Sequence, residues 1–440
     1  MIGVLRNGTY RHLFLAQVIA LIGTGLATVA LGLLAYDLAG PNAGAVLGTA
    51  LAIKMIAYVG VAPVAAAFAE RLPRRAMLVS LDLVRAAVAL LLPFVSELWQ
   101  VYILIFVLQS ASAAFTPTFQ ATIPDVLPDE KEYTRALSLS RLAYDLESVA
   151  SPMLAAALLT VISFHSLFAG TVVGFLASAA LVGSVILPNP KALEHRGIYE
   201  RTTRGLRIYL ATPRLRGLFA LNLAVAAAGS MVIVNTVVLV QAEFGLTQPD
   251  TALALTAFGA GSMIAALLLP RLLDKTQDRS VMLAGGLVLV IGLFIGSFVP
   301  SFALLLPLWL ALGLGYSVAQ TPSGRLIRRS SHPEDRPALF AAQFALSHAC
   351  WLVTYPLAGW LGATLGLSAT FAALGVIAVV AVLIAMRLWP AQDPDEIEHV
   401  HVTLADDHPH LVGADRIGNG HRHRHAYVID SHHPEWPSPA

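Results

Sequence analysis

Residues 366–388 read GLSATFAALGVIAVVAVLIAMRL, and Arg387 is the only charged side chain in this stretch. The hydrocarbon core of a bilayer is about 30 Å thick, and a helix of about 20 mostly apolar residues spans it. The whole chain of 440 residues shares this character, since 57% of its residues are hydrophobic and 12% are charged. Soluble domains carry about 25% charged residues. The sequence therefore excludes a soluble globular protein and predicts a polytopic membrane protein.

Eleven further stretches pass the same length test, so we expect an all-α membrane protein with twelve transmembrane helices. The first begins after Met1–Arg11 without a small-residue cleavage site, and we expect a retained helix, not a signal peptide. The eleven stretches lie near residues 12–36, 44–69, 76–96, 99–122, 137–161, 164–187, 216–240, 250–270, 280–298, 302–322 and 337–362.

The basic residues between these stretches are distributed asymmetrically. Lys and Arg occur in the amino-terminal segment and in the loops after the second, fourth, sixth, eighth and tenth stretches, and the intervening loops contain neither. Loops on the cytoplasmic side of a membrane carry an excess of Lys and Arg. The asymmetry predicts that both termini are cytoplasmic.

The longest polar connection, residues 188–215, divides the twelve stretches into two groups of six. A weak repeat supports the division, because Ala66–Arg71 after the second stretch parallels Ala266–Arg271 after the eighth. Two similar halves are typical of secondary transporters with a central binding site. We expect four parts: an amino-terminal half at 1–187, a cytoplasmic linker at 188–215, a carboxyl-terminal half at 216–390 and a cytoplasmic tail at 391–440.

Other chemistry finds no support in the sequence. The net charge of +1 gives no footprint for nucleic acid, and Cys350, the single cysteine, excludes an internal disulfide. A glycine-rich phosphate loop and a His-Glu-x-x-His motif are both missing from the sequence. We therefore expect a secondary transporter without a cofactor, and not an enzyme or an ATP-driven pump.

The loop after the second stretch carries a family resemblance. The major facilitator superfamily has Gly-x-x-x-Asp-Arg-x-Gly-Arg-Arg at this place, and the chain reads Ala66-x-x-x-Glu70-Arg71-Leu72-Pro73-Arg74-Arg75. The chain resembles this superfamily over residues 5–390. The resemblance implies a gating role for four charged residues, although both glycines of the signature are replaced; the four are Glu70, Arg71, Arg74 and Arg75.

A narrower resemblance rests on other segments. Phe115–Pro128, with the sequence FTPTFQATIPDVLP, is similar to the branch that contains siderophore exporters and related efflux permeases. Together with Tyr10–Phe14, Ala35–Gly40, Ser138–Glu147 and a histidine-rich tail, it resembles the nickel-resistance permeases of that branch. This resemblance implies export of Ni²⁺, with Co²⁺ as a second ion, in exchange for protons. We expect a monomer in a bacterial cytoplasmic (inner) membrane. The metal ion is then the substrate.

The composition changes abruptly after Pro390. The tail contains nine of the fourteen histidines, in His-x-His pairs and one adjacent pair, together with nine acidic residues. Few apolar residues accompany them, so we expect a disordered tail. Neutral imidazole is a good ligand for Ni²⁺, Co²⁺, Cu²⁺ and Zn²⁺. The candidate metal ligands are His399, His401, His408, His410, His421, His423, His425, His432 and His433.

Ionisable residues inside the apolar stretches are the candidates for proton coupling, because a charge in the hydrocarbon needs a partner or a function. Asp82 can pair with Arg85, and Asp145 can pair with Arg141, since the spacings place each pair on one helix face. Both pairs then serve structure or proton coupling. Glu147 has no cation at the corresponding spacings, and Lys54 in the second stretch is a possible partner. A buried, intermittently paired carboxylate of this kind is able to exchange protons near neutral pH.

His348 and Cys350 lie close together in the eleventh stretch and are the best intramembrane metal ligands that the sequence offers. Gln343 precedes them, and Asn222 and Asn235 in the seventh stretch supply neutral ligands. The alternative interpretation is that these side chains form hydrogen bonds between helices. The preferred interpretation is a proton-coupled exporter of a divalent transition metal. The alternatives are export of a siderophore or hydrophobic drug, and a membrane-anchored metal buffer or sensor.

Overall fold

The computed structural model describes most of the chain. The described residues are 2–39, 43–69, 72–188, 198–394, 396–401, 404, 408–418, 420–430 and 432–437. All structural statements below concern these residues.

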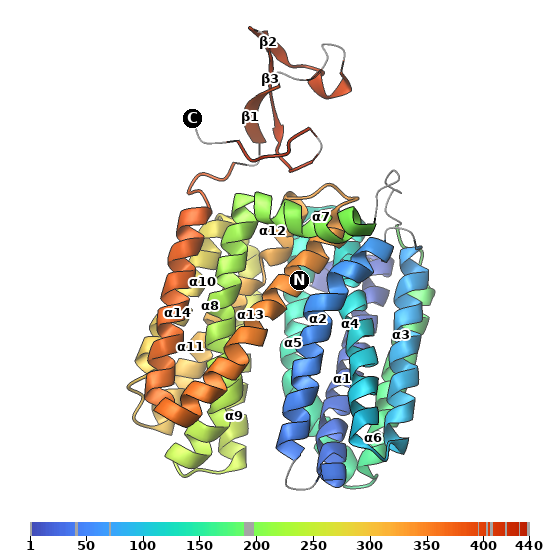
Figure 1. The fold of residues 1–440 in the computed structure, drawn as a ribbon, viewed down its shortest axis with the longest axis vertical. Helices are drawn as coiled ribbons and strands as arrows, with labels where there is room; N and C mark the ends of the chain where they lie inside the picture. Colours follow the sequence, from blue (N-terminus) through green and yellow to red (C-terminus); the bar gives the residue numbers. More distant parts are fainter. Residues whose placement is uncertain are drawn as a thin grey trace.

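Two groups of long helices stand side by side (Figure 1). The amino-terminal half contains α1 (Gly8–Ala39), α2 (Ala43–Ala69), α3 (Arg74–Leu91), α4 (Leu98–Val126), α5 (Glu130–Leu159) and α6 (Phe164–Gly183). The carboxyl-terminal half contains α8 (Pro213–Val237), α9 (Gln248–Leu273), α10 (Asp278–Gly296), α11 (Phe302–Gln320), α12 (Ser323–Arg329), α13 (Arg336–Leu365) and α14 (Leu367–Leu388). Short helical turns occupy Ile2–Arg6, Leu92–Phe94, Val238–Glu243 and Pro409–Leu411.

Eleven helices in the described part of the chain are long and apolar enough to cross a membrane. The expected fifth span is the exception. It corresponds to α5, which has 30 residues but contains charged side chains in its first turns and at Arg141, Asp145 and Glu147. Because α5 packs between α1 and α9, part of its surface faces protein and not lipid. Sequence reasoning therefore located this helix correctly, although it is more polar than its neighbours.

Close helix packing builds each half. In the amino-terminal half α1 packs on α6 and α2 on α4, while in the carboxyl-terminal half α9 packs on α11 and α8 on α14. Gly261 shows how closely the backbones approach, because a Cβ atom there would overlap the carbonyl oxygen of Leu310 on α11. Small residues permit such approaches in membrane helix pairs. The two halves meet where α2 packs on α13 and α5 on α9.

The linker contains a helix that sequence reasoning did not predict. Helix α7 (Ile198–Ala211) lies across the end of the bundle, where it packs on α13 and α2 (Figure 1). Arg204 on its surface forms an ion pair with Asp335, and Gly205 lies against the backbone of Ala338 at the start of α13. We call this end of the bundle, where α7, α12 and the carboxyl-terminal tail lie, the tail end.

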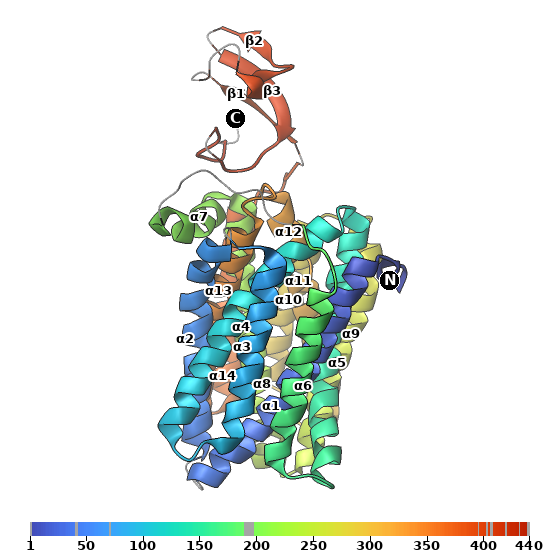
Figure 2. The ribbon, with the colours of Figure 1, turned by 90° about the vertical axis from the view of Figure 1, so that its right-hand side faces the viewer.

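The tail forms a small sheet at this end and stands out from the bundle (Figure 2). Strands β1 (Glu396–His401), β2 (Asp415–Ile417) and β3 (Gly420–Ala426) are antiparallel in the order β1-β3-β2. The expectation of a disordered tail is therefore wrong for the described residues. The charged residues of one face pair across the strands, as in Arg422–Glu398 at 3.3 Å, and the segment 427–429 buries three apolar side chains.

Candidate functional site

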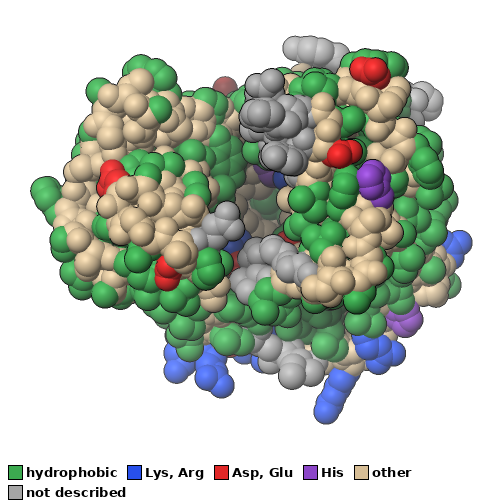
Figure 3. Space-filling model, turned by 90° about the horizontal axis from the view of Figure 1, so that it is seen from below, with side chains coloured by type: hydrophobic (Ala, Val, Ile, Leu, Met, Phe, Trp, Pro, Cys, Tyr) green, Lys and Arg blue, Asp and Glu red, His purple; other side chains and the backbone are tan. Residues whose placement is uncertain are grey.

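The two halves enclose a hollow that opens at the end opposite the tail. Figure 3 shows it from that side, with basic, acidic and histidine side chains visible inside the opening. Charged groups in such a place are shielded from lipid by the helices around them. The hollow lies between the halves and is the candidate route for a transported molecule.

Lys54 and Glu147 meet near this interface between the halves. Lys54 is on α2 and Glu147 is on α5, and their charges interact although the helices are far apart in the sequence. Ser151, one helical turn further along α5, lies beside Glu147 at the same point. Gly25 on α1 leaves the space for both side chains, because a Cβ atom there would overlap them. Lys54 and Glu147 are thus near enough for their charges to interact, and an ion pair between them stays a prediction.

His348 on α13 faces the same region. Its ring lies 4.7 Å from the ring of Tyr58 on α2 and 4.2 Å from that of Phe344, and it interacts with the charge of Lys54. Its Nδ1 is 2.7 Å from the carbonyl oxygen of Phe344, so Nδ1 must carry the proton and donate it. The lone pair is then on Nε2, which is the nitrogen that is able to bind a proton or a metal ion. Lys54, Glu147 and His348 therefore form a group of ionisable residues contributed by both halves.

The other expected pathway residues lie elsewhere on the helices. Cys350 belongs to the apolar core of the carboxyl-terminal half, and the Gln343 oxygen accepts a hydrogen bond from the Tyr209 hydroxyl of α7. Asn235 donates to the carbonyl oxygen of Ala358 at 3.2 Å, which joins α8 to α13. Asn222 is buried, and its Nδ2 has no hydrogen-bond partner among the described residues. The structure does not gather these side chains around His348.

Two ion pairs inside the bundle connect helices. Asp82 pairs with Arg85 and accepts a hydrogen bond from Ser178 at 2.7 Å, which ties α3 to α6. Arg141 pairs with Asp145 at 2.6 Å and also donates to Ser262 of α9 at 2.9 Å. The second pair therefore reaches the carboxyl-terminal half. Neither pair is in contact with Lys54 in the hydrogen bonds and ion pairs of the described residues.

Charged residues close the bundle at the tail end. Asp125 at the end of α4 accepts from Arg74 at 2.5 Å and also pairs with Arg336 at the start of α13. Nearby, Arg325 on α12 pairs with Glu130 at 2.6 Å and donates to Thr134 at 2.7 Å. These contacts join the two halves, so the bundle is closed here and open at the opposite end.

This closure includes one of the four residues expected in the gating loop. Arg74 is buried and takes part through Asp125, whereas Arg75 is exposed, and Glu70 and Arg71 lie outside the described residues. Sequence reasoning missed Asp125 and Arg336, although both were in segments that it had singled out for other reasons. Their role depends on a contact between halves that are distant in sequence.

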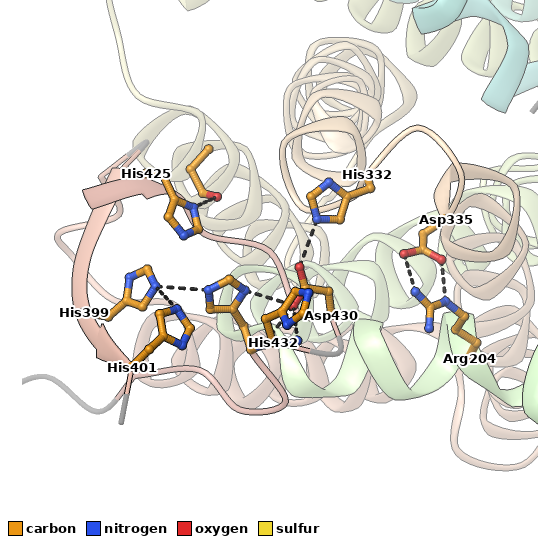
Figure 4. Close-up of polar contacts among 10 residues, drawn as sticks. Arg204, His332, Asp335, His399, His401, His425, Asp430 and His432 are labelled. Carbon is orange, nitrogen blue, oxygen red and sulfur yellow. Dashed lines mark hydrogen bonds and ion pairs between the residues drawn. The ribbon is translucent and has the colours of Figure 1, made fainter. Parts of the chain in front are cut away.

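Six histidines of the tail converge on one point. One ring nitrogen of each lies within 4.8 Å of the corresponding nitrogens of all the others. Figure 4 shows part of this group beside Asp430. We call it the six-histidine cluster, and its members are His399, His401, His410, His423, His425 and His433. The other three candidate ligands, His408, His421 and His432, lie outside it.

The strands explain why the cluster forms. Successive side chains in a strand point to opposite faces, so the His-x-His repeats of β1 and β3 place their histidines on one face. His399 is directly opposite His423 in the pairing of the two strands. His410 comes from the turn at Pro409–Leu411, and His433 comes from the segment after β3. The alternation was visible in the sequence and predicts strands, but the polar composition had favoured disorder.

The cluster is electrostatically prepared for a cation. Burial, together with the charges of the neighbouring histidines, lowers the pKa of His399, His401 and His410 to about 4. These imidazoles are therefore neutral at pH 7, and no proton has to leave before a metal ion binds. Burial alone would raise the pKa of Asp430, but hydrogen bonds from His332 and His433 and from two backbone N–H groups bring it below its usual range. Asp430 therefore stays a carboxylate.

The folded tail contacts the carboxyl-terminal half through polar groups. Asp393 pairs with Arg329 of α12 at 2.7 Å and with Arg214 of α8 at 3.4 Å. Asp430 pairs with His332, between α12 and α13, at 3.2 Å (Figure 4). The candidate metal site is thus attached to the segment that also carries the tail-end closure.

Comparison with known proteins agrees with this architecture. The family model of the Major Facilitator Superfamily matches residues 13–223 and 218–405. The chain belongs to this superfamily, and it is a multi-pass membrane transporter and not an enzyme.

Curated relatives match over a limited part of the chain. The Bacillus subtilis protein "Uncharacterized MFS-type transporter YfiS" is 27% identical to this chain over 144 residues, which is 33% of this chain and 34% of that protein. "Macrolide efflux protein A" of Streptococcus pyogenes is 26% identical over 152 residues, which is 32% of this chain and 37% of the relative. The chain thus aligns with about a third of the length of these relatives.

Solved structures share the fold over nearly all of their length. The human organic anion transporter MFSD10 (TETRAN) has a TM-score of 0.75 at 12% identity, covering 87% of this chain and 99% of that one. The Escherichia coli fucose:proton symporter FucP gives 0.70 at 13% identity, covering 87% and 98%. A bacterial homologue of the iron transporter ferroportin in an outward-facing state gives 0.72 at 14% identity, covering 86% and 99%. At these identities the likeness establishes the fold alone.

The closure at the tail end leads to a first prediction. Asp125→Asn removes the charge that Arg74 and Arg336 share, and breaking a buried ion pair costs about 3 kcal/mol. The bundle then opens at the tail end more often. Because the native Cys350 is buried, a cysteine introduced at Leu137, which lies against Gly324 across the interface, reports the opening through its rate of maleimide labelling.

We expect labelling to be at least about tenfold faster in the Asp125→Asn protein. Asp129→Asn is the matched control, since Asp129 caps α5 within one half and does not cross the interface. Equal labelling rates in the two variants would show that Asp125 does not hold the halves together.

Proposed function

We propose that this transporter exports a divalent transition metal ion from the cytoplasm in exchange for protons. The six-histidine cluster is the observation that carries the proposal, because a compact group of neutral imidazoles suits Ni²⁺, Co²⁺ and related ions. Ni²⁺ is the proposed principal substrate and Co²⁺ a second one, on the resemblance to nickel-resistance permeases. The similarity to an efflux protein supports the outward direction.

The tail end is the proposed cytoplasmic side of a bacterial inner membrane. The basic residues of the loops support this orientation, since Arg74, Arg325 and Arg336 all lie at this end. The hollow of Figure 3 then faces the outside of the cell. In this orientation the six-histidine cluster lies where cytoplasmic metal ions approach, and both termini are cytoplasmic.

Proton coupling is proposed for Glu147, with Lys54 as its alternating partner. A carboxylate paired with an amine inside the bundle releases its proton when the amine approaches and takes one up when the amine moves away. His348, which interacts with Lys54, is the proposed metal contact inside the bundle. Asp145 and Asp82 are weaker candidates for proton coupling, because each is already paired with an arginine.

Export of an organic compound is the second candidate function. The partial similarity to "Macrolide efflux protein A" favours it, and a siderophore or hydrophobic drug would then be the substrate. The tail would be an accessory in that case. A third possibility, a metal buffer or sensor anchored by inert helices, fits the structure less well, because an inert anchor has no need of Lys54, Glu147 and His348.

A metal-by-metal growth challenge tests the substrate. Cells that contain the protein should tolerate more Ni²⁺ than cells without it and should hold less nickel. Deletion of residues 391–440 should weaken this tolerance without abolishing it, since the pathway lies in the bundle. Resistance to organic compounds with unchanged nickel content would favour the second candidate function. Full nickel tolerance after the deletion would show that the tail has no role in export.

Glu147→Gln tests proton coupling. The amide cannot exchange a proton, so pH-driven Ni²⁺ movement in membrane vesicles should fall by at least about tenfold. Glu243→Gln is the control, because Glu243 is an exposed carboxylate at a helix end. Unchanged pH-driven movement in the Glu147→Gln protein would exclude this residue as the coupling group.

His348→Ala tests the internal metal contact. Loss of the Nε2 lone pair should reduce Ni²⁺ efflux several-fold while leaving the helix bundle folded, since the ring is only partly buried. The His165→Ala variant, changed in a histidine of the first turn of α6, should transport normally. Normal efflux by His348→Ala would place the metal pathway elsewhere.

A further inference from the structure

The rings of the six-histidine cluster are arranged as three opposed pairs. Every ring contacts the rings of both other pairs, with centroid separations between 4.7 and 5.1 Å. Among these six described rings, the two members of a pair do not contact each other. The pairs are His399 with His410, His401 with His425, and His423 with His433. Three opposed pairs with all other combinations adjacent define the corners of an octahedron.

The nitrogen separations agree with this arrangement. His399 Nε2 lies 3.1 Å from the Nε2 atoms of His401 and His423, and 3.0 Å from that of His433. At a metal–nitrogen distance of about 2.1 Å, adjacent ligands are about 3.0 Å apart around an octahedral ion and about 3.4 Å apart around a tetrahedral one. The observed distances match the octahedral value.

Hydrogen bonds alone do not account for this packing. A ring nitrogen carries either one proton or one lone pair, so His399 Nε2 is unable to form hydrogen bonds with three neighbouring nitrogens at once. The Nε2 atoms of His410 and His425 are also buried without a hydrogen-bond partner in the described structure. A single cation at the centre would give all of these nitrogens a partner.

The outer ring nitrogens orient several of these histidines. Nδ1 of His399 is 3.1 Å from the carbonyl oxygen of Ile397, and Nδ1 of His425 is 2.8 Å from that of Ala426. Each Nδ1 therefore donates its proton outward, and the lone pair of Nε2 points inward. Outer hydrogen bonds of this kind are typical of histidines that bind metal ions.

Asp430 provides the corresponding contact for His433. Its Oδ1 accepts from Nδ1 of His433 at 2.9 Å, while its Oδ2 accepts from Nε2 of His332 at 3.2 Å. A carboxylate behind a metal-binding histidine fixes the ring and strengthens the ligand. One carboxylate thus orients a ligand of the cluster and connects it to the transport bundle.

We propose that the six-histidine cluster binds one divalent ion in octahedral coordination by six imidazole nitrogens, with Asp430 as the positioning residue behind His433. The cluster then binds ions that accept this geometry readily, such as Ni²⁺ and Co²⁺. Zn²⁺ prefers four tetrahedral ligands and Cu²⁺ a tetragonal set, so the geometry selects against both. The inference rests on the proposed function for the cellular role of the ion, but its coordination is measurable without transport.

The full-length protein in detergent or nanodiscs tests the coordination directly. Ni²⁺ titration should give one tight site, and X-ray absorption of the loaded protein should show six nitrogen ligands at about 2.1 Å. The Co²⁺ form should show the weak visible absorption of a six-coordinate ion, and an equal amount of Zn²⁺ should not displace Ni²⁺. Intense four-coordinate Co²⁺ absorption, or several weakly bound ions, would overturn the proposal.

Variants separate the cluster from the other histidines. His399→Ala should weaken Ni²⁺ binding by at least about tenfold and change the Co²⁺ spectrum. His421→Ala is the matched control, because His421 lies on β3 beside His423 and outside the cluster, so binding should be unchanged. Equal loss of binding in the two variants would mean that the whole histidine-rich tail binds metal ions without a defined site.

Asp430 has its own test. Asp430→Asn should weaken Ni²⁺ binding about 10- to 100-fold, the usual effect of losing an outer-shell partner. Asp430→Glu should restore part of the affinity, and the Co²⁺ spectrum should remain six-coordinate in both variants. Unchanged affinity in Asp430→Asn would remove Asp430 from the site. A six-coordinate site in a protein that fails to move Ni²⁺ in vesicles would uphold this inference and contradict the proposed function.

Discussion

A charge inside the hydrocarbon region needs a partner, and this constraint determines much of the structure. Asp82 pairs with Arg85, Asp145 pairs with Arg141, and Glu147 interacts with Lys54. The first two pairs form within single helices and then bind a neighbouring helix. The third interaction links α2 to α5 without an arginine, which is why Glu147 is the carboxylate proposed for proton exchange. A structural carboxylate and one proposed for exchange therefore differ in the residue type of the partner and in the helix that carries it.

The hydrophobic pattern was sufficient to predict the long helices of the bundle, because each must be long enough to cross a membrane and must satisfy its own backbone hydrogen bonds. Helix α5 shows the limit of that argument, since burial against α1 and α9 allows it to be polar. Helix α7 shows another limit. It lies outside the apolar stretches, and its place follows from contacts such as Arg204–Asp335 that hydropathy does not encode.

The sequence predicted which residues belong to the candidate sites better than it predicted how those residues are arranged in space. The spacing rules found the local pair Arg141–Asp145, but the group of Lys54, Glu147 and His348 depends on how the two halves meet. In the tail, composition predicted metal-binding histidines and also disorder. The first expectation named all six residues of the cluster. The second failed because the period-two alternation of β1 and β3 gathers the histidines on one face, a signal that average composition does not contain.

The tail and the tail-end closure share one segment of the chain. Arg325 and Arg336 contact the amino-terminal half, whereas Arg329 and His332, between them in sequence, contact the tail. Opening of the bundle at this end must separate Arg336 from Asp125 and therefore move the segment relative to one of its two partners. Whatever holds the tail in its folded form then contributes to the free-energy difference between the closed and open states, because a bound ligand shifts an equilibrium by its different affinity for the two states.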